Sequence, residues 1–258
     1  MTAEHVIDLN ADLGESYGAW TMGDDEALLA IVTRANVACG FHAGDPLVMR
    51  RTVRLAAARG VAVGAHPAFP DLQGFGRRRM ELAPDELEAM LLYQIGALAG
   101  VCRAEGVPLA HVKPHGALNN MACADVSLAR TVMRAVRAYD PALPVLAPAC
   151  SALEQAALEA GQPVLREVFA DRAYQADGQL VPRREPGAVL HDPDAAVAHV
   201  LRMLAAGGLV TRDGAVLPTP IDSICVHGDG PQAIATARRL RDALVAAGWR
   251  LAAGAPSA

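Results

Sequence analysis

Apolar and polar positions alternate along this chain in short segments, each of which begins like a strand and ends in polar side chains and glycine. Six segments follow this pattern, at residues 8–15, 36–45, 63–67, 111–119, 167–174 and 225–230. If the strands run parallel, their polar ends meet at one end of the sheet. Enzymes with parallel α/β folds place their chemistry at that end.

The hydrophobic periodicity predicts strands and helices in alternation. Strands are expected at residues 6–13, 35–39, 61–66, 111–115, 145–149, 164–170 and 223–227. Helices are expected at residues 24–32, 46–59, 84–105, 125–139, 151–160, 193–206 and 232–247. In the longest of these helices, apolar residues recur at spacings of three and four, as on a face that packs against a core.

The side-chain pattern of the strands favours a barrel over a flat sheet. In the first strand Asp8, Asn10 and Asp12 alternate with apolar residues, so these polar side chains share one face. Lys113 and His115 share a face of a later strand in the same way. In a flat sheet helices would cover such a polar face, whereas in a closed barrel the face points toward the solvent-accessible opening of the barrel. We therefore predict a seven-stranded parallel (β/α) barrel, a distorted TIM-like fold.

The βα units follow one another without a linker of low complexity, which indicates a single domain. We expect the barrel to occupy residues 1–252 and residues 253–258 to form a loose tail. The chain can fill such a core, because 52% of its 258 residues are hydrophobic. Since only 4% are aromatic, that core must be mainly aliphatic.

Charge and composition exclude several classes of function. A net charge of −5 gives no support to nucleic-acid binding, which requires a basic surface. No apolar run predicts a membrane span, and the N-terminus lacks the features of a signal peptide. The five cysteines are scattered, which is typical of reduced thiols in a cytoplasmic protein. Cys39 and Cys225 lie beside polar clusters, where we favour buried packing over a nucleophilic role.

Residues that follow the first three predicted strands form the first candidate cluster. Asp12, His42 and His66 would offer a carboxylate and two imidazoles to an open metal site, and Glu15 and Asp45 belong to the same cluster. The alternative is a hydrogen-bonded polar layer without a metal. Ligands from separate strands have no diagnostic spacing in the sequence, so both interpretations stay open.

The segment at 111–119 supplies the second cluster. Lys113 could stabilise an anionic transition state, and the alternative is a structural ion pair with an aspartate of the first strand. His115 and His227 could transfer protons, because an unperturbed imidazole titrates near neutral pH. Asp229 lies close to His227 in the sequence and could orient it.

Substrate-binding candidates come from the strand ends and from arginine-rich loops. Arg77 and Arg183 could grip a carboxylate or phosphate through paired N–H groups, and solvated loop charge is the alternative for each. The glycine-rich run that contains Arg77 also suggests a mobile lid. The other candidates are polar residues at the strand ends: Asn10, Glu15, Asn36, Asn119 and Asp171. A GxxxxGK[ST] loop is absent, so the sequence leaves the location of any ATP site open.

Six motifs together carry a resemblance to a known family: DLNADLGE, ANVACGFHAGDP, GAHPAFPDLQGFGRR, HVKPHGALNN, EVFADRAY and ICVHGDGP. In this order, and over nearly the whole chain, they resemble the LamB/YcsF lactam-utilisation family. The resemblance implies a seven-stranded α/β barrel of the glycoside hydrolase/deacetylase superfamily type. It also implies ATP-dependent opening of 5-oxo-L-proline to L-glutamate, with ATP and Mg²⁺, and with 5-oxoprolinase subunits B and C as partners.

Under this resemblance, the residues of the two clusters take roles in lactam opening. Asp12, His42 and His66 would position the reacting amide or the attacking water, with or without a metal. Lys113 would steady negative charge on the activated oxygen.

The remaining roles fall to residues from later loops. His115 or His227 would move protons, with Asp229 as the orienting group. Arg77 or Arg183 would hold the carboxylate of the substrate. These assignments rest on the resemblance and not on strand periodicity.

Two other functions stay open. A stand-alone metal-dependent amide hydrolase or deacetylase would use Asp12, His42 and His66 as metal ligands and would need no ATP. A non-catalytic module would capture a lactam and present it to partner subunits. The density of titratable residues at one end of the barrel favours an enzyme over such a module.

Overall fold

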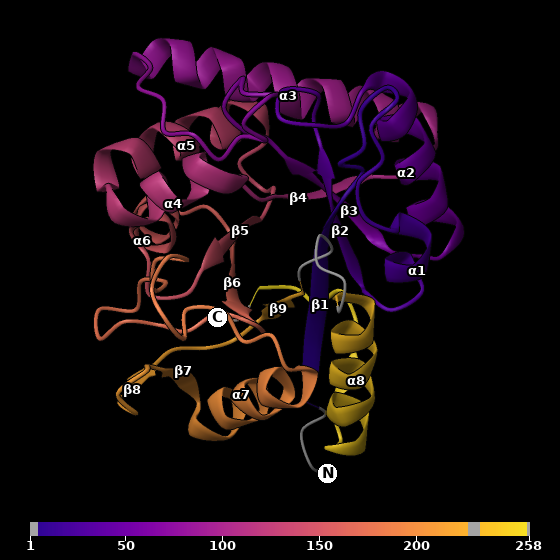
Figure 1. Cartoon of the computed structure of the whole chain (residues 1–258). Helices are drawn as coiled ribbons and strands as arrows, with labels where there is room; N and C mark the ends of the chain where they lie inside the picture. The colour runs from indigo at the N-terminus through magenta and orange to yellow at the C-terminus, as the bar shows by residue number, and fades with distance from the viewer. Residues whose placement is uncertain (1–4, 227–232, 257–258) are drawn as a thin grey trace.

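Seven parallel strands form a closed barrel, as the sequence predicts. The computed structural model describes residues 5–226 and 233–256. In chain order the barrel strands are β1 (Val6–Leu13), β2 (Arg34–Ala38), β3 (Ala62–His66), β4 (Leu109–Val112), β5 (Val145–Pro148), β6 (Val164–Phe169) and β9 (Ser223–Cys225). Each strand lies beside the next one in this order, and β9 pairs with both β6 and β1, which closes the ring (Figure 1).

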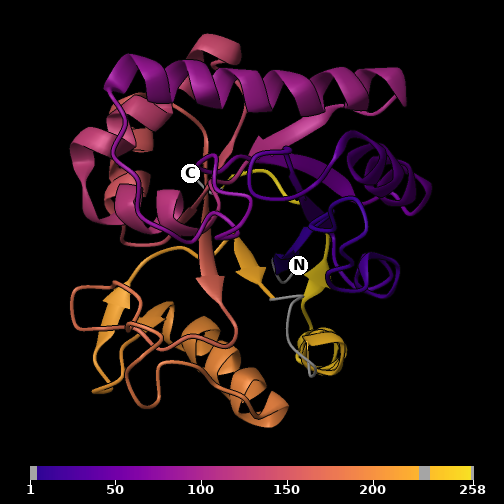
Figure 2. The same ribbon diagram turned by 45° about the horizontal axis from the view of Figure 1, so that its top comes forward.

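Helices cover the outside of the barrel and connect its strands. They are α1 (Asp25–Leu29), α2 (Pro46–Ala58), α3 (Pro84–Ala104), α4 (Gly116–Ala124), α5 (Val126–Tyr139), α6 (Ala152–Glu159), α7 (Pro193–Ala206) and α8 (Ala233–Ala246). Figures 1 and 2 show α3 on one side of the strands and α7 and α8 on the other. At the start of α2, Asp45 accepts hydrogen bonds from two backbone N–H groups, and Pro46 follows where no N–H is needed.

Four short elements are absent from the pattern that the sequence predicts. The helix α4 occupies residues that read as a polar loop after β4. The strands β7 (Gly208–Val210) and β8 (Val216–Pro218) form an antiparallel hairpin, and β10 (Arg250–Leu251) pairs with the start of β1. The carbonyl of Gly254 accepts a hydrogen bond from Arg34 Nη2 at 2.5 Å, so the segment expected to be loose is held at this residue.

Polar side chains fill the inside of the barrel, where the alternation in β1 predicts them. Asn36 Nδ2 donates to Asn10 Oδ1 at 2.8 Å, and His111 Nε2 donates to Asn36 Oδ1 at 2.7 Å. All three side chains are fully buried. Gly64 in β3 leaves the space for the imidazole, because a Cβ there would lie 2.2 Å from ring atoms of His111. A missing side chain on β3 therefore allows a residue of β4 to reach the middle of the barrel.

The helix α3 is the one helix, among the described residues, that is long and apolar enough to cross a membrane by length and composition alone. The residues of its apolar stripe are nevertheless buried within the protein, as their spacing predicts: Leu87, Leu91, Ile95, Leu98 and Cys102. Gln94 of the same helix is also buried and bonds both the N–H and the carbonyl of Ala68, just after β3. These are the contacts of a core helix, and they hold the chain beside the barrel mouth.

Candidate functional site

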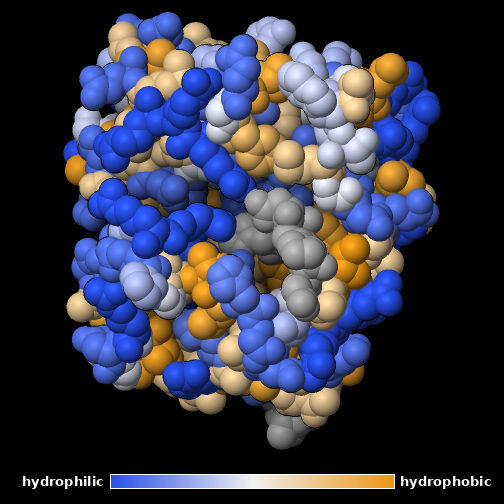
Figure 3. Space-filling view, in the orientation of Figure 1, coloured by the Kyte–Doolittle hydropathy of each residue, from blue (hydrophilic) through white to orange (hydrophobic). Residues whose placement is uncertain are grey.

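A polar cavity of about 530 Å³ opens at the carboxyl ends of the barrel strands. Its lining includes Asp12 from β1, His66 from β3, and Lys113 and His115, which follow β4. The helix α4 and the segment after β6 supply further walls. Hydrophilic side chains gather over this part of the surface, on the left of the view in Figure 3. The polar strand ends therefore converge, as the sequence pattern predicts.

Lys113 lies in this cavity with its ammonium group held by several acceptors. Its Nζ is 2.7 Å from Glu167 Oε1, 3.3 Å from Asp12 Oδ1 and 3.2 Å from Asn10 Oδ1. Cys225 Sγ is a further contact at 3.3 Å. Burial disfavours the charged form, but the neighbouring carboxylates and thiol outweigh burial and raise the pKa of Lys113 well above its usual range. Lys113 is therefore a fixed cation and not a proton acceptor.

The two roles considered for Lys113 are compatible in the structure. The ammonium group pairs with Asp12 and also lines the cavity. Asp8, the other aspartate considered as a partner, lies nearer the start of β1 and instead contacts Arg34 Nε at 2.9 Å and Ser223 Oγ at 2.5 Å. Burial raises the pKa of Asp8.

Glu167 is a site residue that the sequence reasoning missed. It lies in β6 and is fully buried, and its Oε2 atom has no hydrogen-bond partner among the described residues. One sequence signal could have found the pair, because Lys113 is the only lysine among the chain's 23 lysine and arginine residues. A single lysine directly after a buried strand needs a buried carboxylate as its partner. Glu167 stands within another buried strand and meets that need.

Three imidazoles and a carboxylate form a second group beside the lysine, the histidine cluster (Glu15, His42, His66 and His115). One possible ligand atom from each residue lies within 4.8 Å of the others. His66 Nε2 is 2.9 Å from His115 Nδ1, and His42 Nε2 is 3.1 Å from Glu15 Oε1. The rings of His42 and His115 stack at 3.8 Å with an angle of 8° between their planes. Asp12 Oδ2 lies 3.3 Å from His66 Nε2 and joins the histidine cluster to the lysine site.

Burial favours the neutral form of two of these imidazoles. It lowers the pKa of His115 to about 3, and positive charge on His42 or His66 acts in the same direction. It also holds the pKa of His42 well below its usual range. Burial raises the pKa of Glu15 to about 7 against the attraction of His115. For Asp12, burial opposes ionisation, but the neighbouring imidazole and ammonium groups hold its pKa well below the usual range.

The structure groups the residues of the predicted metal set of Asp12, His42 and His66 differently, and whether they hold a metal stays a prediction. His42 faces Glu15, whereas Asp12 Oδ1 accepts hydrogen bonds from the asparagine and the lysine inside the barrel. His115, which the sequence groups with the lysine, completes the set of imidazoles instead. The reason is the strand order: β4 pairs with β3, so the residues after β4 lie beside the end of β3.

The loop after β3 packs over the histidine cluster. Asp71 accepts a hydrogen bond from Arg78 Nε at 2.8 Å and so closes the loop on itself. Phe75 has a left-handed φ of 55°, and its carbonyl accepts a hydrogen bond from His115 Nε2 at 2.9 Å. A Cβ on Gly76 would lie 2.9 Å from carbon atoms of two cluster histidines, so this approach requires glycine. The glycine-rich run therefore packs against the site, and its mobility as a lid stays a prediction.

The predicted substrate-binding residues divide into those that line the cavity and those that do not. Arg77, Asn119 and Arg183 line it, from the loop after β3, from α4 and from the segment after β6. Asn10 and Asn36 are fully buried inside the barrel and bond to each other. These two asparagines are not among the described residues that line the cavity, because the barrel closes around them.

The other sequence candidates lie elsewhere. Glu15 belongs to the histidine cluster, and Asp171 is not among the described residues that line the cavity. His227 and Asp229 lie outside the described residues, so their roles stay predictions. Cys39 is buried, and burial raises the pKa of its thiol to about 12, which agrees with a packing role.

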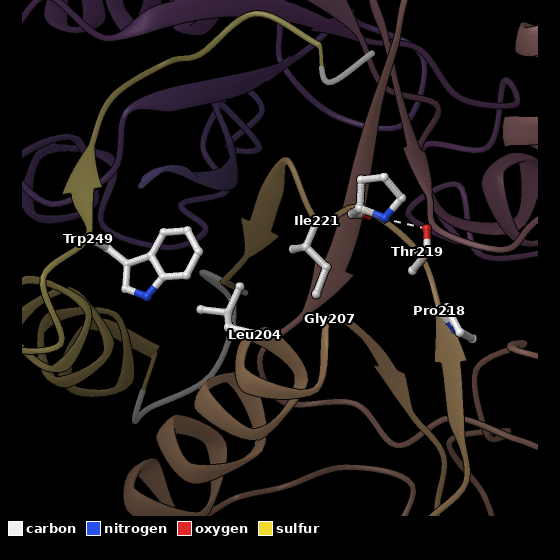
Figure 4. A pocket seen from close by; sticks show the side chains of 7 residues that line it. Leu204, Gly207, Pro218, Thr219, Ile221 and Trp249 are labelled. Atoms are coloured by element: carbon white, nitrogen blue, oxygen red, sulfur yellow. Dashed lines mark hydrogen bonds between the residues drawn. The ribbon is translucent and has the colours of Figure 1, made fainter. Parts of the chain in front are cut away.

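A second cavity, of about 470 Å³, lies at the other end of the barrel. Figure 4 shows Leu204, Ile221 and Trp249 around it. Trp249 precedes β10, which pairs with the start of β1, and Ile221 precedes the start of β9. None of the described residues that line this cavity has an acidic or basic side chain. It therefore offers no groups for acid–base or metal chemistry.

Fold and site together define a class: a parallel (β/α) barrel with an enzyme-type polar site at the carboxyl ends of its strands. The chain belongs to the LamB/YcsF family, which it matches over residues 7–257.

Known proteins agree with this assignment. A protein of Azoarcus sp. (strain BH72), named as the A subunit of 5-oxoprolinase, is 62% identical over 245 residues, which cover 95% of this chain and 96% of the relative. The crystal structure of a lactam utilization protein from Thermus thermophilus has a TM-score of 0.91 and 48% identity, over 96% of this chain and 100% of that one. The names of these relatives support a hydrolase-related role.

A more distant structure shares the fold alone. The catalytic domain of a peptidoglycan N-acetylglucosamine deacetylase from Eubacterium rectale has a TM-score of 0.51 and 10% identity, over 100% of this chain and 90% of that one. The expected (β/α) barrel fold is therefore confirmed.

Proposed function

We propose that this chain is the A subunit of an ATP-dependent 5-oxoprolinase, which opens 5-oxo-L-proline to L-glutamate while ATP is hydrolysed to ADP and phosphate. It would act in the cytoplasm with two partners, subunits B and C. The 62% identity to a protein of that name supports the proposal. The structural observation that carries it is the position of Lys113, a fixed cation in a small polar cavity beside the histidine cluster.

The proposed reaction needs activation of an amide. A lactam is stabilised by resonance, and transfer of the γ-phosphoryl group of ATP to its oxygen releases ADP and leaves an O-phosphorylated ring. Water then adds to the ring carbon, and the C–N bond breaks as the ring nitrogen gains a proton. The product is γ-glutamyl phosphate. A second water cleaves this acyl phosphate into L-glutamate and inorganic phosphate.

The cavity can supply what this sequence of steps requires. The ammonium group of Lys113 would stabilise negative charge on the activated oxygen, and such a charge is worth more in a site that excludes water. Asp12 lies next to it and would polarise the attacking water and pass its proton to the ring nitrogen.

The size and rim of the cavity suit a small anionic substrate. Its volume of about 530 Å³ lies within the usual range for small-molecule sites. Arg77 and Arg183 on its lining offer N–H groups to the α-carboxylate of 5-oxoproline or to phosphate. Mg²⁺ would enter bound to ATP, as part of the co-substrate.

The test is glutamate release from 5-oxo-L-proline by this chain together with subunits B and C, with MgATP and each protein omitted in turn. We expect glutamate only from the complete mixture, and a Lys113→Met variant should lower the rate by about 100-fold or more. An Arg239→Met variant, which removes an exposed cation on α8, is the control. Glutamate formed by this chain alone without ATP would instead indicate the stand-alone amide hydrolase. Full turnover by Lys113→Met would indicate the lactam-binding module.

A further inference from the structure

Two backbone carbonyls determine which nitrogen carries the proton in two rings of the histidine cluster. His66 Nδ1 lies 2.7 Å from the carbonyl oxygen of Lys113, and His115 Nε2 lies 2.9 Å from that of Phe75. A carbonyl oxygen only accepts, so each of these nitrogens must donate an N–H group. In a neutral imidazole the other nitrogen then has a lone pair and no proton. The free lone pairs are on His66 Nε2 and His115 Nδ1.

These two lone pairs face each other. His66 Nε2 and His115 Nδ1 are 2.9 Å apart, which is a hydrogen-bond distance. When both rings are neutral, however, neither of these two nitrogens carries a hydrogen atom. Both rings are buried, so bulk water does not separate them. An approach of this kind requires a positive species between the nitrogens, either a proton or a metal ion.

Further donors surround the same point. Glu15 Oε1 is 3.5 Å from His115 Nδ1 and 3.1 Å from His42 Nε2. His42 is also fully buried, so its Nε2 atom is shielded from bulk water. One proton would satisfy only the pair of facing lone pairs. An ion at the centre of the histidine cluster would satisfy all four donors.

The spacing of the donors matches the shell of a small cation. In a tetrahedral zinc site with bonds of about 2.0–2.1 Å, neighbouring ligand atoms are about 3.3 Å apart. Three of the six separations within the histidine cluster, 2.9, 3.1 and 3.5 Å, lie around that value, and all six are within 4.8 Å. The hydrogen bonds from His66 and His115 to backbone carbonyls are also the kind of outer contact that orients metal-binding histidines.

We infer that the histidine cluster is a binding site for one divalent transition-metal ion, with zinc as the best match. Three imidazole nitrogens and one carboxylate oxygen suit zinc and similar ions, whereas Mg²⁺ prefers oxygen ligands. The site is therefore distinct from any Mg²⁺ that accompanies ATP. Its ligands are Glu15, His42, His66 and His115, and Asp12 lies beside it as a neighbouring charge.

The place of the ion relative to the cavity suggests what it would do. Two of its ligands, His66 and His115, line the cavity together with Lys113. With all four protein ligands bound, such an ion would have no position left for water, and it would act as a fixed positive charge that stabilises the negative charge developing during lactam opening. This role rests on the proposed function, whereas metal binding itself does not.

The experiment measures metal binding by the isolated chain, produced without a polyhistidine tag and freed of metal with a chelator. Zn²⁺ is titrated by calorimetry in competition with a chelator of known affinity, and Mg²⁺ is titrated in parallel. We expect one Zn²⁺ per chain and no comparable binding of Mg²⁺. Co²⁺ should give the strong visible absorption of a four-coordinate site with nitrogen ligands.

The variants decide where the ion lies. His66→Gln and His115→Gln should each weaken Zn²⁺ binding by more than about 100-fold, because changes to outer contacts alone cost about 10- to 100-fold. Glu15→Gln, at a partly exposed position, is the second test if a histidine variant does not fold. His191→Gln, on an exposed loop, is the control and should bind normally.

Two results would overturn the inference. One is the absence of stoichiometric Zn²⁺ and Co²⁺ binding by the folded wild-type chain, and the other is binding that survives both histidine substitutions and Glu15→Gln. The assay uses no ATP, lactam or partner protein. A failure of the proposed 5-oxoprolinase activity would therefore leave its result unchanged.

Discussion

Lys113 Nζ and Glu167 Oε1 lie 2.7 Å apart inside the barrel, and both side chains are buried. Removal of either partner leaves a charge in an environment that water does not reach. A buried charge without a partner is far more costly than the pair itself. Lys113 therefore contributes to the stability of the barrel through Glu167 and also takes part in the proposed chemistry of the cavity.

Lys113→Met should therefore lower the free energy of unfolding by about 3–5 kcal/mol, because it leaves the carboxylates of Glu167 and Asp12 without their cation. The double variant Lys113→Met/Glu167→Gln should recover part of this loss, since it removes one of the two orphaned charges. Urea unfolding of the wild type, both single variants and the double variant measures the coupling. Additive losses would show that the two residues do not form a pair.

The carboxyl group of Glu15 should make stability depend on pH. Its pKa is about 7 in the folded chain against an ordinary value of 4.5, so the folded state binds more protons between these pH values. Stability from this group is then fully present below about pH 4.5 and is lost as the pH rises toward 7, by about 3 kcal/mol at most.

The measurement compares wild type with Glu15→Gln by urea unfolding from pH 4.5 to 7.5, in the presence of a chelator so that no metal contributes. Wild type should lose stability relative to the variant as the pH rises. If the free energies of unfolding of wild type and Glu15→Gln change in parallel with pH over this range, the raised pKa of Glu15 is ruled out. Subtracting the free energy of unfolding of the variant from that of wild type at each pH also removes the opposite contribution of His115, whose pKa is lowered to about 3.

A methyl group on β3 should displace the imidazole inside the barrel. The Cβ of a Gly64→Ala variant would lie 2.2 Å from ring atoms of His111, which would break the bond of that ring to Asn36. We expect a loss of about 1–3 kcal/mol in the free energy of unfolding, as for other overpacked cores. Gly96→Ala in α3 is the matched control, because open space surrounds that position. The control should gain about 0.4–1 kcal/mol, and equal effects at both positions would contradict the crowding argument.

Arg183 and its neighbour Arg184 provide a paired test of substrate binding. Both side chains are exposed, but only Arg183 is among the residues that line the cavity. Arg183→Ala should raise the KM for 5-oxo-L-proline by about 10-fold or more with a smaller change in kcat, because a charge-assisted contact to the carboxylate contributes about 1.5–3 kcal/mol. Arg184→Ala should leave both constants unchanged. If the two variants behave alike, the arginine of the cavity does not contact the substrate.

Much of the fold was predictable because it depends on local periodicity. The polar face of β1 and the apolar stripe of α3 follow from side-chain periods of two and of about 3.6 residues, and both lie where the sequence predicts. The bounds of α7 match the prediction at both ends, since proline begins the helix and a left-handed glycine follows it. The helix α4 was missed, because His115 and Asn119 give its residues the appearance of a polar loop.

The site was predictable as a set of residues but not as a set of partners. The sequence by itself determined that histidines, an aspartate and a lysine stand at the ends of parallel strands, because polar residues interrupt apolar runs there. Only the tertiary structure decided that Lys113 meets Glu167, 54 residues away, and that His115 meets His66, 49 residues away. Strand order and the closure of β9 onto β1 bring these residues together, and no local pattern in a chain records which distant strand will lie opposite.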